Sequence, residues 1–162
     1  MAEFTLFGAH LSPYVRKVRL ALAYKQLSYK QVQVIPFTPD QPQEFKDNSP
    51  LGKIPLLKVD DQYISDSSVI ISFLERECDT NALIPADNLM AAKALWFEEY
   101  ADSRIVSVVG GHLFAEKILA PIFFKRASNQ EEIELAINTE LPEIFTYLES
   151  QLNNEYLVGN QL

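Results

Sequence analysis

A helical segment between two short strand-like segments constrains the fold of this chain more than any other feature. EFTLFG (3–8) is an apolar and aromatic run, and KQVQV (30–34) alternates apolar and polar residues as a half-buried strand does. Between them, apolar residues recur at helical spacing and predict an amphipathic helix over 13–26. Because a helical crossover joins parallel strands, we expect the two strands to be parallel.

The following segments complete an α/β domain. IPFTPDQPQEF (35–45) contains three prolines and is typical of a surface loop, with room for at most a short helix before Asn48. The strand-like segments PLLKV and QYIS flank the turn Asp60-Asp61-Gln62, and a helical pattern then runs from Ser67 to near Cys78. The resulting hairpin is antiparallel, so the predicted four-stranded sheet over 1–78 is mixed.

The second half of the chain reads as wholly helical. DTNALIPADN has little periodicity and predicts a linker over 79–87, followed by an all-α domain over 88–162. The first helical stretch, 88–119, is expected to bend or break near Gly110-Gly111, and the second covers 128–152. Pro121 and Pro142 limit the continuity of these helices.

Some apolar residues are assigned to the core by their spacing. Trp96 and Phe97 are expected in the core of the helical domain, because aromatic residues at helical spacing are usually buried. Cys78, at the end of an amphipathic helix, is expected to be a small buried apolar residue.

The charge of the chain is unevenly distributed. Residues 1–58 carry eight Lys and Arg against four Asp and Glu, whereas residues 59–162 carry six against eighteen. The total of −8 argues against a general nucleic-acid surface. The basic first part suits a small anionic ligand, although solvated surface charge accounts for the same pattern.

Other compositional features exclude several classes of protein. A single cysteine gives neither a disulfide framework nor a CxxC pair, and His10 and His112 lack metal-ligand spacing. No apolar run approaches the ~20 residues of a membrane span, and MAEFTLF has no basic start of a signal peptide. We therefore expect a cytoplasmic protein without a metal, a membrane or a nucleic-acid partner.

Ser12 stands directly before the helix predicted over 13–26, and its role there has two interpretations. As the N-cap before Pro13 it stabilises the helix by roughly 0.5–2 kcal/mol. A helix N-terminus also carries unsatisfied N–H groups and partial positive charge, and Arg16, Lys17 and Arg19 add to that charge. A hydroxyl that donates to a ligand thiolate there would lower the pKa of the thiol.

Two further motifs have the same double interpretation. In SPLGKIP (49–55), Ile54 before Pro55 either starts an ordinary edge strand or offers its N–H and C=O to an extended peptide-like ligand. In ISDSSVI (64–70), Asp66 or Ser67 caps a helix. The same pair suits an α-amino acid end group, with the serine toward the carboxylate and the aspartate toward the ammonium.

Taken in order, SPYVRKV, SPLGKIPLL and DSSVI resemble the glutathione-binding domain of the cytosolic glutathione transferases, and the serine-type classes most of all. LIPADN and the helical segment with WFEEYADSR resemble the linker and second domain of that family, so the resemblance extends over essentially the whole chain. It implies a thioredoxin-like N-terminal domain with a mixed four-stranded sheet, followed by an all-helical domain. In that family the stretch YLVGNQL leads into further helices, so the helical domain is expected to be incomplete here.

The resemblance also implies roles for single residues. Ser12 corresponds to the serine that stabilises the glutathione thiolate, Ile54 to the residue whose backbone pairs with the cysteinyl part, and Pro55 to the cis-proline of the family. Asp66 and Ser67 correspond to the pair that holds the γ-glutamyl group, and Lys53 to a polar residue facing the ligand. Candidates for the pocket of the apolar electrophile are Leu11, Tyr14, Tyr100, His112 and Phe114.

The expected function is therefore transfer of glutathione to a small apolar electrophile by a cytoplasmic homodimer that acts in detoxification. Two departures keep other functions open: Asp66 stands where glutamate is common, and no basic residue for the glycyl carboxylate is evident over 37–45, with Lys46 a possible substitute. The alternatives are a glutathione-dependent isomerase and a non-catalytic binding or regulatory protein. A thiol-disulfide reductase needs a thiol where Ser12 stands and is disfavoured.

Overall fold

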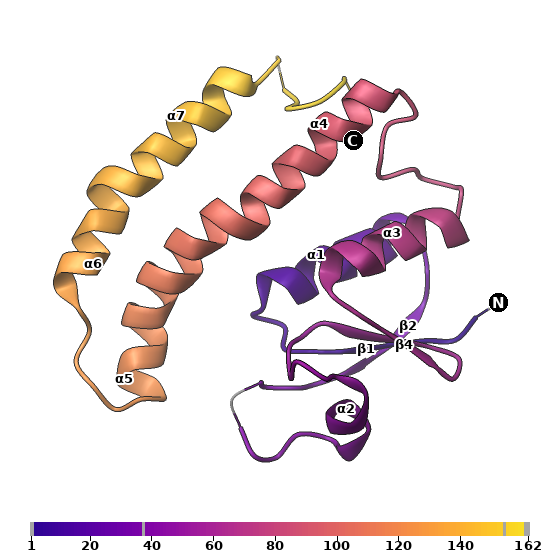
Figure 1. The fold of residues 1–162 in the computed structure, drawn as a ribbon, viewed down its shortest axis with the longest axis horizontal. Helices are drawn as coiled ribbons and strands as arrows, with labels where there is room; N and C mark the ends of the chain where they lie inside the picture. The colour runs from indigo at the N-terminus through magenta and orange to yellow at the C-terminus, as the bar shows by residue number, and fades with distance from the viewer. Residues whose placement is uncertain (1, 37, 154, 161–162) are drawn as a thin grey trace. The chain divides into compact units, whose positions relative to one another are not determined.

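The computed structural model describes residues 2–36, 38–153 and 155–160. It divides the chain into two compact units, Met1–Leu83 and Ile84–Leu162. The first unit contains a sheet and helices, and the second contains helices (Figure 1). Phe37, in the loop predicted after the second strand, lies outside the described residues.

The first unit is built on a four-stranded sheet with the strand order β2-β1-β3-β4. β1 pairs in parallel with β2 and antiparallel with β3, which pairs antiparallel with β4. The mixed sheet predicted from the crossover and the hairpin is therefore confirmed. The strand predicted for QYIS is confirmed over Gln62–Ser65, and the turn before it consists of Asp60 and Asp61. The strands are β1 (Phe4–Phe7), β2 (Tyr29–Val32), β3 (Leu56–Val59) and β4 (Gln62–Ser65).

Both faces of this sheet bury apolar side chains. Phe4 and Leu6 pack in one cluster with residues of α1 (Pro13–Tyr24) and α3 (Ser67–Glu77). Phe7 packs in a second cluster that contains Phe45 of α2 (Gln43–Asn48). This is the short helix for which the sequence left room after the proline-rich loop. Successive residues of β1 therefore point to opposite faces, and helices cover both, as in other α/β domains.

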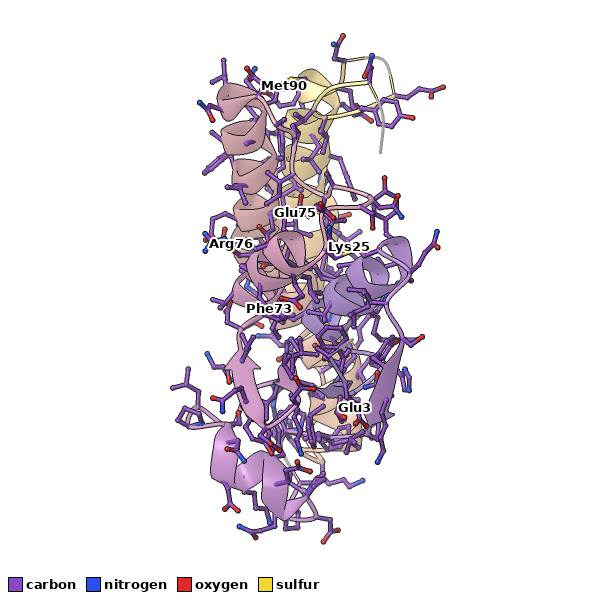
Figure 2. The ribbon with its side chains drawn as sticks, turned by 90° about the vertical axis from the view of Figure 1, so that its right-hand side faces the viewer. Glu3, Lys25, Phe73, Glu75, Arg76 and Met90 are labelled. Carbon is purple, nitrogen blue, oxygen red and sulfur yellow. The ribbon has the colours of Figure 1, made fainter. Side chains whose placement is uncertain are left out.

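A buried lysine ties the ends of α1 and α3 together. Lys25 is 3% exposed, and its Nζ lies 2.8 Å from Glu75 Oε2. The same ammonium donates to the carbonyl oxygens of Cys78 at 2.8 Å and of Thr80 and Asn81 at 3.3 Å. Figure 2 labels Lys25 and Glu75 beside one another. This ammonium satisfies the carbonyl group of the α3 C-cap, Cys78, and two carbonyl groups of the segment that follows the helix.

The burial expected for Cys78 is wrong. The residue is partly exposed, and its Sγ lies 3.1 Å from Thr80 Oγ1. The backbone becomes extended at Cys78, the C-cap of α3, so its carbonyl rather than its thiol faces Lys25.

The second unit consists of two long helical stretches. The first continues through Gly110-Gly111, so of the bend or break predicted there, the break is wrong. Glycine costs a helix only about 1 kcal/mol relative to alanine, and here the pair lies inside a π-helical segment. The first stretch comprises α4 (Asn88–Tyr100), η1 (Ala101–Ile105), η2 (Ser107–Leu119) and α5 (Ala120–Ile122), where η denotes π-helical segments. The second comprises α6 (Gln130–Leu135), η3 (Ala136–Glu140) and α7 (Leu141–Gln151).

The two prolines affect these stretches differently. Pro121 lies in α5, and the helix ends with Ile122. Pro142 does not interrupt the second stretch, because it follows the π-helical segment η3. In a π-helix each hydrogen bond spans five residues instead of four. The change from this pattern to the α-helical pattern at Pro142 accommodates a residue that has no N–H to donate.

The helical unit leaves many apolar side chains exposed. Its core is formed by Val108, Ala136 and Ile144, and α4 contains no buried residue. The core position predicted for Trp96 is therefore wrong: its side chain is 51% exposed, and its Nε1 donates to Tyr147 Oη at 2.9 Å. Phe97 is only half-buried. Two helical stretches cover each other along one side only, so residues on their other sides stay accessible.

A buried carboxylate joins the two helical stretches at their connection. Glu116 is 4% exposed and accepts two hydrogen bonds from the Arg126 guanidinium and one from the Asn129 N–H at 2.7 Å. The Ser128 hydroxyl donates to the Glu116 carbonyl at 2.7 Å. The bonds from Arg126 and Asn129 lower the pKa of Glu116 to about 2.

The first helical stretch is also long and apolar enough, by length and composition, to cross a membrane. The helix Asn88–Ile122 contains an 18-residue window with a mean hydropathy of 1.5. Core helices of water-soluble proteins pass the same test, so this finding is weak evidence for a membrane segment.

The Lys25 contacts predict a large loss of stability on substitution. In Lys25→Met the Glu75 carboxylate and three carbonyl groups lose a buried cation, so we expect the free energy of unfolding to fall by about 3 kcal/mol. Urea denaturation measures the change, with the exposed Lys93→Met as the control. Equal stability of Lys25→Met and the wild type would contradict this role.

The Glu116 contacts predict a pH-dependent stability. A carboxyl group whose pKa is lowered from 4.5 to about 2 on folding stabilises the protein fully above pH 4.5, and this contribution is lost as the pH falls from 4.5 toward 2. Glu116→Gln is therefore expected to lower Tm by several degrees at pH 7, and the difference from the wild type should shrink below pH 4.5. Thermal unfolding across this range measures it, with the exposed Glu134→Gln as the control. A difference that does not change with pH would contradict the assignment.

Candidate functional site

Three of the predicted segments leave the sheet at the same edge. Phe7 at the end of β1 stands opposite Leu56 at the start of β3, and Leu56 stands opposite Ser65 at the end of β4. The loop to Ser12 follows β1, Ile54 lies two residues before β3, and Asp66 follows β4. The register therefore brings the three motifs from distant parts of the sequence to one edge.

Ser12 lies at the N-terminus of α1 as its N-cap. Its Oγ accepts a hydrogen bond from the Val15 N–H at 3.4 Å, which is longer than a typical bond of this kind. No described residue accepts the proton of the Ser12 hydroxyl. The first turn of α1 contains no acidic residue. The serine therefore caps the helix weakly and keeps its own donor, beside the positive end of the helix dipole.

Gly8 sets the path of the chain between β1 and Ser12. A Cβ atom on Gly8 would overlap Val15 Cγ2 and would lie 3.5 Å from Ile54 Cβ. The Gly8 N–H donates to the Val32 carbonyl at 3.0 Å. Only glycine lets the backbone pass this close to both the first turn of α1 and Ile54.

The segment before β3 presents an unpaired backbone. The bond between Ile54 and Pro55 is cis, as the resemblance implies. Among the residues with described positions, none forms a hydrogen bond to the Ile54 N–H or C=O. The loop is held by the Ser49 hydroxyl, which donates to the Lys53 carbonyl at 3.0 Å, while the Lys53 side chain is exposed. Pro55 is buried.

Asp66 is the N-cap of α3, and Ser67 is its first residue. Asp66 Oδ1 accepts from the N–H groups of Ser68 at 2.9 Å and Val69 at 3.2 Å. Its backbone has a φ of 76°, in the left-handed region, which costs a residue of this type about 1 kcal/mol. Asp66 is exposed, whereas Ser67 is 3% exposed. The second carboxylate oxygen of Asp66 has no hydrogen-bond partner within the described parts of the chain.

The candidate pocket residues fall in both units. Leu11 is 78% exposed, and Tyr14 is partly buried in the first turn of α1. In the helical unit, Tyr100 packs against Tyr147 with ring centroids 4.9 Å apart, and the Phe114 side chain is 37% exposed.

His112, the remaining pocket candidate, is paired across the two helical stretches. Its Nδ1 lies 2.6 Å from Glu140 Oε2, and Arg104 donates to Glu140 Oε1 at 3.1 Å. Burial acts to raise the pKa of Glu140, but the hydrogen bonds to His112 and Arg104 outweigh it and hold that pKa below its usual value.

A depression of about 400 Å³ lies elsewhere in the first unit, and none of the candidate residues lines it. At one side of it, Glu44 accepts from Lys58 Nζ and from Tyr63 Oη, each at 2.7 Å. The bond from Lys58 is the main cause of a lowered pKa of Glu44 and a raised pKa of Lys58. The depression is lined by Glu3, Thr5, Lys30, Val32, Glu44, Lys58, Asp60 and Asp61.

No group of three or more His, Cys, Asp or Glu residues could hold a metal ion within residues 2–36, 38–153 and 155–160.

Lys46, considered for the glycyl carboxylate, donates to the Pro39 carbonyl at 3.0 Å. Sequence reasoning missed Gln31, whose Nε2 donates to the Gly8 carbonyl at 2.9 Å. Its place in an alternating strand offered no signal for this contact.

Comparisons with known proteins concern the family and the fold of the chain. The family model described as "Glutathione S-transferase, N-terminal domain" matches residues 6–82. Glutathione S-transferase U4 of Arabidopsis thaliana is 24% identical over 98% of this chain and 64% of its own length. A glutathione S-transferase of Pseudomonas putida is 35% identical over 54% of this chain and 39% of its own length.

The solved structure of FzlA from C. crescentus superposes with a TM-score of 0.88 at 26% identity, covering 99% of this chain and 72% of that chain. The chain spans less than two thirds of the length of the two curated relatives above. Its fold, a thioredoxin-like domain with a four-stranded mixed sheet followed by a helical domain, is the glutathione S-transferase fold. Residues 6–82 therefore match the N-terminal domain of the glutathione S-transferases, and the chain has the fold of that family.

Proposed function

We propose that this chain binds glutathione, activates its thiol as a thiolate and transfers it to a small apolar electrophile. Ser12 is the catalytic residue in this proposal. The backbone of Ile54 beside Pro55, the pair Asp66 and Ser67, and the Lys53 side chain bind the rest of glutathione. We further propose a cytoplasmic homodimer of the serine-type class that acts in detoxification.

The observation that carries the proposal is the hydrogen bonding of the Ser12 hydroxyl. Its oxygen accepts only a long bond from Val15, and no described residue takes its proton. A hydroxyl donor and the positive end of α1 both stabilise a negative charge on sulfur more than a neutral thiol. Together they favour the thiolate, which is the reactive form of glutathione.

The other candidate contacts match the polar groups of a peptide-like ligand. The unpaired N–H and C=O of Ile54 can form the two hydrogen bonds that an extended cysteinyl residue requires. Asp66 uses one carboxylate oxygen to cap α3, which leaves the other for an ammonium group. The N-terminus of α3, which begins at Ser67, is suited to the carboxylate of the same γ-glutamyl group.

In the reaction, the thiolate sulfur attacks an electrophilic carbon of the second substrate. The carbon–sulfur bond forms while the leaving group departs with its electron pair, or a neighbouring carbon takes up a proton where the reaction is an addition. The thiol proton has by then been released to solvent. Leu11, Tyr14, Tyr100, His112 and Phe114 are the proposed contacts of the apolar substrate.

Removal of the Ser12 hydroxyl tests the catalytic assignment. Glycine is tolerated at an N-cap, so Ser12→Gly removes the donor at a cost of only a few tenths of a kcal/mol in helix stability. We expect kcat/KM for conjugation of glutathione to an aryl halide at pH 7 to fall by about 10²-fold, with Tm nearly unchanged. Ser12→Thr, which keeps a hydroxyl, should retain part of the activity. Equal activity of the wild type and Ser12→Gly would refute the role of Ser12, and binding of glutathione without turnover in the wild type would indicate a binding protein instead.

The charge of Asp66 is tested by a substitution that keeps the helix cap. Asparagine caps a helix as well as aspartate does, so Asp66→Asn removes the charge without loss of the cap. Because the lost ion pair contributes to binding rather than to the chemical step, we expect KM for glutathione to rise by about tenfold with kcat little changed. Asp87 caps α4 through Leu89 and Met90 in the same way, and Asp87→Asn is the matched control. An unchanged KM in Asp66→Asn would remove Asp66 from the site.

A further inference from the structure

The β1–α1 loop that leads to Ser12 is anchored by a side chain from the neighbouring strand. Gln31 lies on β2, opposite Leu6 of β1, and its Nε2 donates to the Gly8 carbonyl at 2.9 Å. The Gly8 N–H donates to the Val32 carbonyl at 3.0 Å. β2 therefore holds both polar groups of the Gly8 backbone, one through its main chain and one through the Gln31 amide.

From Gly8, the anchoring reaches Ser12 in two short steps. The Ser12 N–H donates to the Ala9 carbonyl at 3.1 Å and closes the turn between these residues. Ser12 then caps α1 through Val15, the residue whose side chain packs against the Gly8 backbone. The peptide between Gly8 and Ala9 is therefore linked through short contacts to the backbone of Ser12 and to Val15, the residue that Ser12 caps.

The Gln31 amide is present at a cost to stability. Its Oε1 is buried and has no hydrogen-bond partner among the described residues. A buried polar atom without a partner costs about 1–3 kcal/mol. An apolar side chain of similar size would avoid that cost but would leave the Gly8 carbonyl without its donor, so the two costs nearly cancel. In return, the Gln31 amide donates a hydrogen bond from its N–H group to the Gly8 carbonyl.

We infer that Gln31 is a positioning residue for Ser12, which acts through the Gly8 carbonyl and does not touch the substrate. The inference rests on the proposed function of Ser12. It separates two effects that usually change together: loss of the Gln31 amide should impair catalysis while leaving the stability of the fold nearly unchanged, because the substitution removes one unpaired buried oxygen, Gln31 Oε1, and leaves another, the Gly8 carbonyl.

Gln31→Met tests this separation, because methionine has a similar length and adapts to irregular space but donates no hydrogen bond. We expect Tm to stay close to that of the wild type, and kcat at pH 7 to fall by about three- to tenfold with KM for glutathione within about twofold. The apparent pKa of the kcat–pH profile should rise, because a displaced hydroxyl stabilises the thiolate less. Gln33, which is exposed just after β2, supplies the matched control Gln33→Met.

A second readout does not depend on glutathione. Hydrogen exchange of the Ser12 and Val15 amides should be at least about tenfold faster in Gln31→Met, although global stability is unchanged. Unchanged exchange and an unchanged kcat–pH profile would overturn the inference, as would a loss of Tm that accounts for the loss of activity. Faster exchange in a protein whose wild type does not activate glutathione would support the anchoring of Ser12 and refute the proposed function. If Gln31→Met does not fold, Gln31→Leu replaces it.

Discussion

The close approach of Gly8 to Val15 and Ile54 is the constraint on which the rest of the candidate site depends. It brings the first turn of α1 and the segment before β3 together at one edge of the sheet. A side chain on Gly8 would push these two segments apart, and the Ser12 hydroxyl would move away from the unpaired backbone of Ile54. The fold of the first unit and its proposed chemistry therefore depend on the same contact.

Both helix N-termini of the candidate site combine stability with binding capacity. Ser12 and Asp66 each cap a helix with one oxygen atom and keep a hydroxyl proton or a second carboxylate oxygen for a ligand. Asp66 occupies the left-handed region of backbone conformation, which an ordinary cap does not require. The Gln31 amide likewise carries a buried oxygen without a partner. Such local costs are found where a structure serves binding or catalysis as well as folding.

Much of the first unit could be predicted from the sequence, because its patterns are local. The alternating strands, the amphipathic face over 13–26 and the three ordered motifs predicted the mixed sheet. The contacts of Lys25 and Gln31 could not be predicted, because they join residues that only the folded chain brings together. In the helical unit, glycine was given too much weight as a helix breaker, and Trp96 was assigned to a core that two helical stretches do not provide.

The central claim is that Ser12, at the N-terminus of α1, stabilises the thiolate of bound glutathione. The most direct measurement is the ultraviolet absorbance of the thiolate against pH, for glutathione bound to the wild type and to Ser12→Gly. An unperturbed thiol has a pKa of about 8.5. The account predicts a bound thiol with a pKa below about 7.5 in the wild type, and a return toward the free value in Ser12→Gly. An unshifted pKa in wild-type protein that binds glutathione would contradict it.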